Sequence, residues 1–202
     1  MTRILPAACL LGLLAGCATV PQAPPGTGAG WAAYRAEAAA VTAWRLEGRV
    51  AVRHGDEGWS ARLRWRHGPE GWRLELRDPL GRRALRLTAD ARGALLEAPG
   101  GVREWAPDAA VLLGRHAGLP VPVAALGWWA RGLPAPGPAP RLETGPGGRP
   151  VRLEQLGWTV RYLAFGEAAP GVVLPRRLEL SRAALRVRLV VDRWALGQDA
   201  TG

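Results

Sequence analysis

The chain has 202 residues and a formal net charge of +10, and all of its basic side chains other than histidine are arginine. This length suits one domain with a sizeable core. High arginine beside high alanine and glycine is typical of a GC-rich coding sequence, so the charge is not taken to indicate nucleic-acid binding. The two cysteines, Cys9 and Cys17, exclude a disulfide framework in a mature chain that begins at Cys17.

The first 17 residues have the pattern of a bacterial lipoprotein signal. A short positive start at residues 1–3 is followed by the apolar stretch 4–14, which is too short to span a bilayer. Residues 14–17 (LAGC) match the lipobox, in which the cysteine thiol receives a diacylglyceryl group and becomes the new N-terminus. We therefore expect residues 1–16 to be removed and Cys17 to be the site of lipid attachment. An ordinary signal peptide with a coincidental cysteine is the alternative.

A flexible tether and a first helix are predicted next. Residues 17–30 hold the lipidated cysteine and a segment rich in proline, glycine, alanine and threonine, with little to pack against a core. Residues 31–41 place large apolar side chains at helical spacing, which predicts a helix. The folded domain is expected to cover residues 31–197.

The period of the apolar residues then changes from helical to alternating. Alternation of apolar and charged residues, interrupted by glycine-rich turns, predicts an antiparallel meander with one apolar and one charged face. Its strands are expected at residues 44–52, 59–65, 72–76 and 85–88, with weaker ones at 93–98 and 101–105.

Two short helices interrupt the strands in the middle of the chain. They are predicted at residues 108–117, capped by Asp108, and at 121–131. Strands resume afterwards and are expected at residues 141–144, 151–155, 157–165, 178–180 and 185–191, closing at Trp194. The chain is thus predicted to form a single, mainly β domain.

The apolar face of so long a sheet needs a cover, and three short helices are too few to fill it. An incompletely filled, curled sheet leaves an apolar cavity of the kind that holds ligands in β-barrels. Many of the large side chains are indoles, which suit such a lining, although each tryptophan alone is more simply explained as core. The cavity candidates are Trp44, Leu46, Val50, Leu63, Trp65, Trp72, Leu74, Leu76, Trp128, Trp129 and Trp158.

Signals of catalysis and of metal binding are weak. His54 and His67 fall in predicted turns and His116 on a helix, none beside a nucleophile motif, and there is no G-x-S-x-G. The spacing of histidine and acidic residues does not predict a metal site. We therefore expect no enzymatic activity, no metal and no cofactor, and read the carboxylates in the turns as solvated.

Several segments resemble the LolB family of outer-membrane lipoprotein receptors. Residues 44–52 (WRLEGRVAV) are similar to the W-x-x-x-G-R-x-A-V strand that opens its members. Further similar segments follow in the same order: 78–81 (DPLG), 119–122 (LPVP), 128–134 (WWARGLP), 155–160 (QLGWTV), 174–178 (LPRRL) and Trp194. The resemblance covers nearly the whole expected mature chain.

The resemblance implies a half-open antiparallel β-barrel of ten or eleven strands with a helical lid over an apolar cavity. It implies a receptor, anchored in the outer membrane and facing the periplasm, that accepts lipoproteins from a LolA-like carrier by binding their acyl chains and inserts them into the inner leaflet. The turn Pro79-Leu80-Gly81 corresponds to the family's membrane-insertion loop, and Ala18 after Cys17 is compatible with outer-membrane sorting. A monomer that contacts outer-membrane lipid and no nucleic acid is expected.

Three other readings stay open at this point. A structural or assembly lipoprotein could use the same sheet to bind a protein partner, and an exposed edge strand over a filled core would favour it. A soluble LolA-like carrier would lack lipid on Cys17. An envelope lipase is the weakest of the three. The arginines of the predicted outer face, such as Arg62, Arg64 and Arg66, could touch lipid headgroups, but a solvated face is the simpler interpretation.

Overall fold

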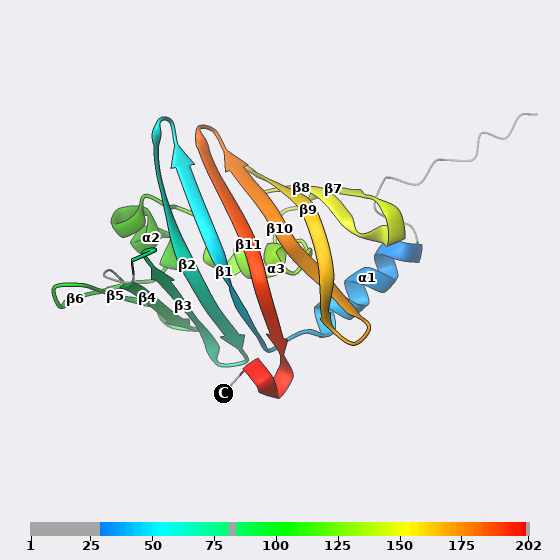
Figure 1. The fold of residues 1–202 in the computed structure, drawn as a ribbon, viewed down its shortest axis with the longest axis horizontal. Helices are drawn as coiled ribbons and strands as arrows, with labels where there is room; N and C mark the ends of the chain where they lie inside the picture. The colour runs from blue at the N-terminus through cyan, green and yellow to red at the C-terminus, as the bar shows by residue number, and fades with distance from the viewer. Residues whose placement is uncertain (1–28, 81–83, 201–202) are drawn as a thin grey trace, which may run out of the picture.

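The computed structural model describes residues 29–80 and 84–200, which form one long antiparallel sheet with helices packed on one of its faces (Figure 1). The eleven strands pair in the order β6-β5-β4-β3-β2-β1-β11-β10-β9-β8-β7. The strands are β1 (Trp44–His54), β2 (Glu57–Gly68), β3 (Gly71–Arg77), β4 (Ala84–Asp90), β5 (Gly93–Ala98), β6 (Val102–Ala106), β7 (Arg141–Thr144), β8 (Pro150–Gln155), β9 (Trp158–Ala169), β10 (Val172–Arg182) and β11 (Leu185–Leu196).

The three α-helices are α1 (Ala29–Ala40), α2 (Ala109–Ala117) and α3 (Val123–Ala130), with short 3₁₀ turns η1 (Pro146–Gly148) and η2 (Gly197–Ala200). The first helix begins at Ala29, within the segment predicted as tether. Helices α2 and α3 lie in the connection between β6 and β7, the two edge strands, and together they cover the sheet. We call this connection, residues 107–140, the strap.

The predicted architecture is confirmed: an open, curved antiparallel sheet with a helical cover on its apolar side. Every strand between residues 44 and 106 lies where alternation predicted it, to within a few residues. The side chain of Asp108 caps α2 by accepting a hydrogen bond from the Ala110 amide at 2.8 Å, as expected. The helix ends at Gly118, whose left-handed φ of 63° suits a C-cap glycine.

The prediction for β9 and β10 was too short. Strand β9 continues to Ala169, and β10 begins at Val172 instead of at residue 178. The difference centres on Pro175, which has no amide hydrogen for the ladder and so argues against a strand in the sequence. The structure accommodates it with register shifts between Pro175 and Arg177 and between Arg177 and Leu178, and the Pro175 carbonyl accepts a hydrogen bond from the Trp194 indole at 3.0 Å.

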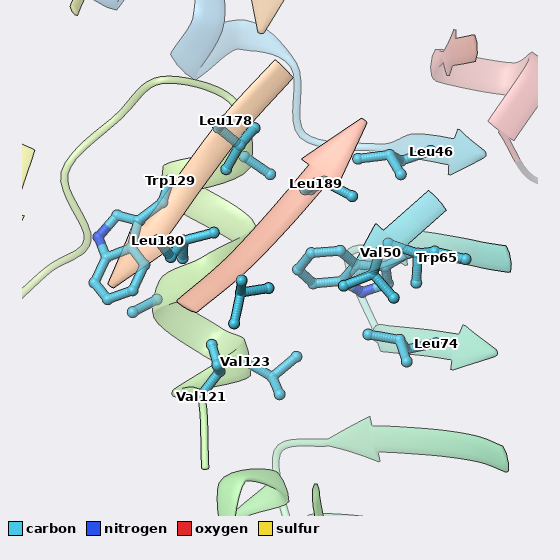
Figure 2. Packing of buried hydrophobic residues seen from close by; sticks show 14 of the residues in the cluster. Leu46, Val50, Trp65, Leu74, Val121, Val123, Trp129, Leu178, Leu180 and Leu189 are labelled. Carbon is cyan, nitrogen blue, oxygen red and sulfur yellow. The ribbon is translucent and has the colours of Figure 1, made fainter. Parts of the chain in front are cut away.

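Alternation decides which side chains reach the core. On β1 the alternate residues Trp44, Leu46, Gly48, Val50 and Val52 are buried under the helices, while Arg45, Glu47, Arg49 and Ala51 face outward. The same holds along β2, β3 and β11. Figure 2 shows side chains from β1, β2, β3, β10 and β11 meeting those of the strap in one cluster. The helix-covered side is called the concave face below, and the other the outward face.

Candidate functional site

All eleven cavity candidates belong to the core of the concave face. Nine of them are buried, and Trp72 and Trp128 are half-buried and packed against the same cluster. Trp44, Trp65, Trp129 and Trp158 are almost completely inaccessible. At its centre, therefore, the concave face is occupied by the protein's own side chains, whereas the sequence analysis expected the helices to leave it partly empty. Helices α2 and α3 thus lie directly on this filled core.

An aromatic cluster occupies the half of this core under β1 and β2. The Trp44 ring lies 4.9 Å from that of Trp65, edge to face, and stacks on His67 at 5.2 Å. Within the described residues, the buried indole nitrogens of Trp44 and Trp65 have no hydrogen-bond partner. An unsatisfied buried donor costs about 1–3 kcal/mol, so this cluster is packed less favourably than its burial alone suggests.

Helix α3 is fixed to the sheet by buried hydrogen bonds from two side chains. The amide of Gln155 on β8 accepts from the Trp129 indole at 3.0 Å and from the Ala135 backbone at 2.9 Å, and it donates to the carbonyls of Ala135 and Pro138. The Tyr162 hydroxyl donates to the Trp129 carbonyl at 3.0 Å. Burial raises the pKa of Tyr162, so the hydroxyl stays a donor at neutral pH.

Arg131, directly after α3, is a buried cation that joins α3 to α1. Its guanidinium donates to the carbonyls of Val41 at 2.6 Å, Ala38 at 3.4 Å and Gly127 at 3.2 Å, and it lies 4.7 Å from the centre of the Trp128 ring. Carbonyls at the C-terminal end of a helix carry the negative end of its dipole, so α1 supplies favourable charge. Burial lowers the pKa of Arg131, but a guanidinium keeps its charge at neutral pH.

Helix α2 is held by a different kind of contact. The Trp59 indole on β2 donates to the Ala117 carbonyl at 3.1 Å, and His116 lies 2.7 Å from the carboxylate of Glu104 on the edge strand β6. Arg115 forms an ion pair with the same carboxylate. We call Trp59, Glu104, Arg115 and His116 the α2 latch. These side chains are partly or largely exposed, so their polar contacts compete with water.

A groove opens beside this latch, at the C-terminal end of α2. Its volume is about 370 Å³, within the range of small-molecule sites. Its apolar wall consists of Trp59, Ala61, Leu76, Leu85, Ala98 and Ala117, which continue the side chains of the concave face to the rim of the sheet. The groove therefore adjoins the core that α2 covers.

The predicted insertion turn projects next to this groove. Asp78 lines the groove, and Leu80, two residues later, is 70% exposed, more than Trp105 at 58%. The structure thus leaves the Leu80 side chain open to solvent. Pro79 is exposed as well, whereas Gly81 lies outside the described residues. Cys17 and Ala18 also lie outside them.

The histidines and acidic residues do not converge on a reactive site. Within residues 29–80 and 84–200 there is no group of three histidine, cysteine or acidic side chains arranged to hold a metal ion. His54 is exposed at the end of β1, His67 near the end of β2 packs in the aromatic cluster, and His116 belongs to the α2 latch. Among the described helices, none is both long and apolar enough to cross a bilayer.

The sequence analysis missed the polar residues that hold the lid. Arg131 and Gln155 lie in two of the segments that resemble the LolB family, but their burial at 5% exposure gives no signal in a hydropathy pattern. Tyr162 alternates with charged residues as any core position does. A cation placed directly after the Trp128-Trp129 pair was the one available hint.

The comparisons with known proteins agree with this architecture. The family model described as outer membrane lipoprotein LolB matches residues 42–194. The outer-membrane lipoprotein LolB of Alkalilimnicola ehrlichii is 40% identical over 195 residues, 96% of this chain and 97% of that protein. That of Stutzerimonas stutzeri is 39% identical over 198 residues, 96% of each chain. A LolA superfamily protein from Nitrosomonas europaea is similar in fold, with a TM-score of 0.56 and 14% identity, over 83% of this chain and 93% of that one.

Proposed function

The chain belongs to the LolB family of outer-membrane lipoproteins, and from this we propose that it accepts lipoproteins by binding their acyl chains under α2 and releases them into the membrane beside Leu80. The protein is a lipid-anchored outer-membrane receptor of lipoprotein transport. Its family is one of lipoprotein receptors and not of enzymes, and we propose no catalytic step. The partner that delivers the cargo is of the LolA type, and the receptor acts as a monomer.

The need for such a receptor follows from the hydrophobic effect. Exposure of an acyl chain of about 16 carbons to water costs roughly 12 kcal/mol, at about 0.8 kcal/mol per methylene. A lipoprotein with several chains therefore cannot diffuse freely through an aqueous compartment. Transfer has to pass from one apolar site to another in contact, and it runs downhill if the receptor binds the acyl chains more tightly than the carrier does.

The observation that carries the proposal is the groove between α2 and the sheet, next to the exposed Leu80. Its apolar wall leads directly into the tryptophan-rich core. An entering acyl chain would displace α2 first, because the contacts of this helix are partly exposed, and would then pack against side chains that now fill the concave face. Because the indole N–H groups of Trp44 and Trp65 have no hydrogen-bond partner in the core, opening it costs less free energy than opening a core in which every buried donor is bonded.

Attachment to the membrane is proposed to be separate from binding. Lipid on Cys17 anchors the chain, residues 18–28 serve as the tether, and the folded domain begins at α1. Leu80 then provides a second, reversible contact at the point where cargo leaves. The domain would thereby exchange between the carrier and the leaflet without losing its own anchor.

Blocking the groove tests the proposal. Ala98→Trp places an indole in the groove wall, and we expect at least a tenfold loss of affinity for a fluorescent acyl probe in a binding titration. Ala51→Trp adds the same side chain at an exposed position of the outward face and should bind as the unsubstituted chain does. Equal affinity of both variants would refute the groove as the entrance.

Release is tested at Leu80. Leu80→Glu should leave acceptance of a lipoprotein from the carrier intact and abolish its incorporation into liposomes, because a carboxylate does not enter the leaflet. Leu163→Glu, at another exposed leucine, is the matched control. Normal incorporation by Leu80→Glu would remove this turn from the mechanism.

One observation favours a second function, that of an assembly lipoprotein that binds a protein partner. Trp105 is 58% exposed on the edge strand β6, where an unpaired edge could add a strand from another chain. Trp105→Ser would then weaken partner binding while leaving acyl-probe affinity unchanged. Under the receptor proposal, acyl-probe binding depends on the groove and not on this edge.

A further inference from the structure

The outward face of the sheet carries a row of alternating charges across seven strands. Glu47, Glu75 and Glu97 stand opposite arginines in direct register on the neighbouring strands, and we call this row the charge ladder. It consists of Arg103, Glu97, Arg86, Glu75, Arg64, Glu47 and Arg193. Its ion pairs measure 3.0–3.7 Å, and opposite charges at directly opposed positions stabilise a sheet. Here the sheet neutralises its own charge.

The surface between this ladder and the hairpin turns β1–β2 and β10–β11 is different, because arginine dominates it. Three of its arginines have close carboxylate partners: Arg49 pairs with Asp192 at 3.0 Å, Arg77 with Glu75 of the ladder at 3.5 Å, and Arg188 with Glu179. The outward arginines of this region are Arg49, Arg53, Arg62, Arg77, Arg177, Arg186 and Arg188, against the carboxylates Glu179 and Asp192. Seven positive and two negative charges leave a local excess of five.

Several of these arginines face one another. Arg62 stands in register between Arg49 on β1 and Arg77 on β3, and Arg53 stands opposite Arg186 across the β1–β11 pair. Among the residues that the structure describes, Arg53, Arg62 and Arg186 have no carboxylate within ion-pair distance. Like charges at directly opposed positions destabilise a sheet, so this arrangement costs stability unless an anion lies between the guanidinium groups.

Hollows on the outward face give such an anion room. One, of about 710 Å³, is lined by Arg49, Arg62 and Arg77, by Asp192, and by ladder residues that include Glu47 and Glu75. Another, of about 840 Å³, is lined by four arginines and two carboxylates: Arg53, Arg161, Arg186, Arg188, Asp56 and Glu179. Arg77 is also the last residue of β3, so the arginines continue directly into the turn that exposes Leu80. In Figure 1 the β1–β2 and β10–β11 turns form the upper end of the sheet.

We propose that Arg53, Arg62, Arg77 and Arg186, the tip arginines, bind the phosphates of anionic phospholipids and hold the hairpin end of the sheet against the membrane. Planar guanidinium groups bind phosphate oxygens in a bidentate manner. Facing arginines, of which Arg53, Arg62 and Arg186 have no carboxylate partner among the described residues, are therefore suited to this headgroup. Arg77 ends β3 three residues before the exposed Leu80, so this cationic surface adjoins the turn where release is proposed, and basic side chains of this kind attract anionic leaflets. This contact goes beyond the proposed acyl-chain exchange: it determines which end of the domain meets the leaflet.

The full lipidated chain in vesicles allows a direct test. A donor dye is attached through His54→Cys, in the exposed β1–β2 turn, since Cys17 is blocked by its lipid, and energy transfer to a headgroup-labelled lipid reports how close the turn lies to the membrane. We expect more transfer in phosphatidylcholine vesicles with about 30 mol% phosphatidylglycerol than in pure phosphatidylcholine. The difference should shrink between about 0.05 M and about 0.5 M salt.

The decisive variant is Arg53→Gln, Arg62→Gln and Arg186→Gln combined. A basic side chain near an anionic leaflet contributes about fivefold in binding, so the ratio of docked to undocked domain should fall about 100-fold. Arg73→Gln, Arg92→Gln and Arg103→Gln combined remove the same charge from exposed sites elsewhere, and this control should change the ratio by no more than about twofold.

Three outcomes would overturn the proposal. The first is an unchanged response to phosphatidylglycerol in the decisive variant, and the second is an equal loss of docking in the control variant. The third is a decisive variant that keeps its lipid response but binds an acidic carrier protein more weakly, which would assign the surface to that protein. Leu80→Ser separates this inference from the proposed function, because it should still dock on phosphatidylglycerol while failing to release cargo.

Discussion

The two helices of the strap cover the same sheet but are held to it in opposite ways. Helix α3 is fixed by buried hydrogen bonds through Gln155 and Tyr162 and by the guanidinium of Arg131. Helix α2 inserts Leu112 and Leu113 into the core, but its polar contacts are the partly exposed α2 latch. Buried polar contacts are costly to break, whereas exposed ones exchange readily with water.

This contrast indicates which part of the lid opens. Movement of α3 would leave the Gln155 amide and several carbonyls without partners inside the protein. Movement of α2 would expose Leu112 and Leu113 and replace the latch contacts with hydrogen bonds to water. An entering acyl chain can offset the lost burial by covering the same apolar surface. We therefore interpret α3 as part of the wall of the site and α2 as its door.

The largest effect is expected from removing the α3 anchor. Trp129→Ala deletes a fully buried indole, and we expect the free energy of unfolding to fall by about 3–5 kcal/mol in urea denaturation. Trp105→Ala, at an exposed tryptophan, should cost less than about 0.5 kcal/mol. A loss at Trp129 no greater than this control would contradict the assignment of α3 as a fixed wall.

Loss of the buried cation should come next. Arg131→Met keeps an apolar stem but leaves the carbonyls of Ala38, Val41 and Gly127 without this donor, so we expect a loss of about 2–3 kcal/mol, measured by the same denaturation. Arg35→Met, at an exposed site on α1, serves as the matched control. Equal stability of the two variants would show that Arg131 does not join α1 to α3.

Weakening the α2 latch should alter rates more than stability. Trp59→Phe with Glu104→Gln should lower the free energy of unfolding by only about 1 kcal/mol. If the loss falls on the closed state, the open population rises about fivefold, and stopped-flow uptake of a fluorescent acyl probe should accelerate by a similar factor. Glu97→Gln breaks ion pairs on the outward face, away from α2, and should leave uptake unchanged. Unchanged uptake in the latch variant would argue against α2 as the door.

The smallest expected effect is a pH dependence at His67. Burial lowers the pKa of His67 and the charge of Arg131 acts in the same direction, against a hydrogen bond with the Thr42 backbone. The folded state therefore favours the neutral ring. Its contribution to stability is complete above the ordinary pKa of about 6.5 and is lost as the pH falls from there through the folded-state pKa.

Because the ring is only half-buried, solvent screening should keep this loss below roughly 1 kcal/mol. It can be measured as the difference in denaturation midpoint between pH 7 and pH 5, and His67→Gln should reduce that difference. His54→Gln, at an exposed histidine, should not. A pH response that persists in His67→Gln would assign it to other groups.

The sequence predicts the sheet better than it predicts the lid, for a physical reason. Alternation along β1 and β2 is imposed by burial of one face, so it can be read directly from residue types. The start of β10 was missed because Pro175 violates that rule and is tolerated only through a local register shift. Arg131 and Gln155 were not recognised because the residue type does not indicate whether a polar side chain is buried or solvated. Only its hydrogen-bond partners in the folded structure distinguish the two cases.

The state of the cavity was beyond sequence reasoning as well. Trp44, Trp65 and Trp129 were correctly assigned to the covered face, but the residue types do not state whether a set of large side chains surrounds a space or fills it. That outcome depends on how closely the strap approaches the sheet, which the buried hydrogen bonds of α3 determine.

The strap has one mechanical consequence. It joins β6 to β7, the two strands at opposite rims of the open sheet, so the same covalent segment that roofs the interior also ties those rims together. If α2 moves away from the sheet, the rest of the strap has to span a different distance between β6 and β7. Opening of α2 and flattening of the sheet are therefore coupled. An acyl chain that spreads the two edge strands would therefore loosen the strap above it. A strap that returns to the sheet would draw β6 and β7 together and push the acyl chain toward the turn at Leu80.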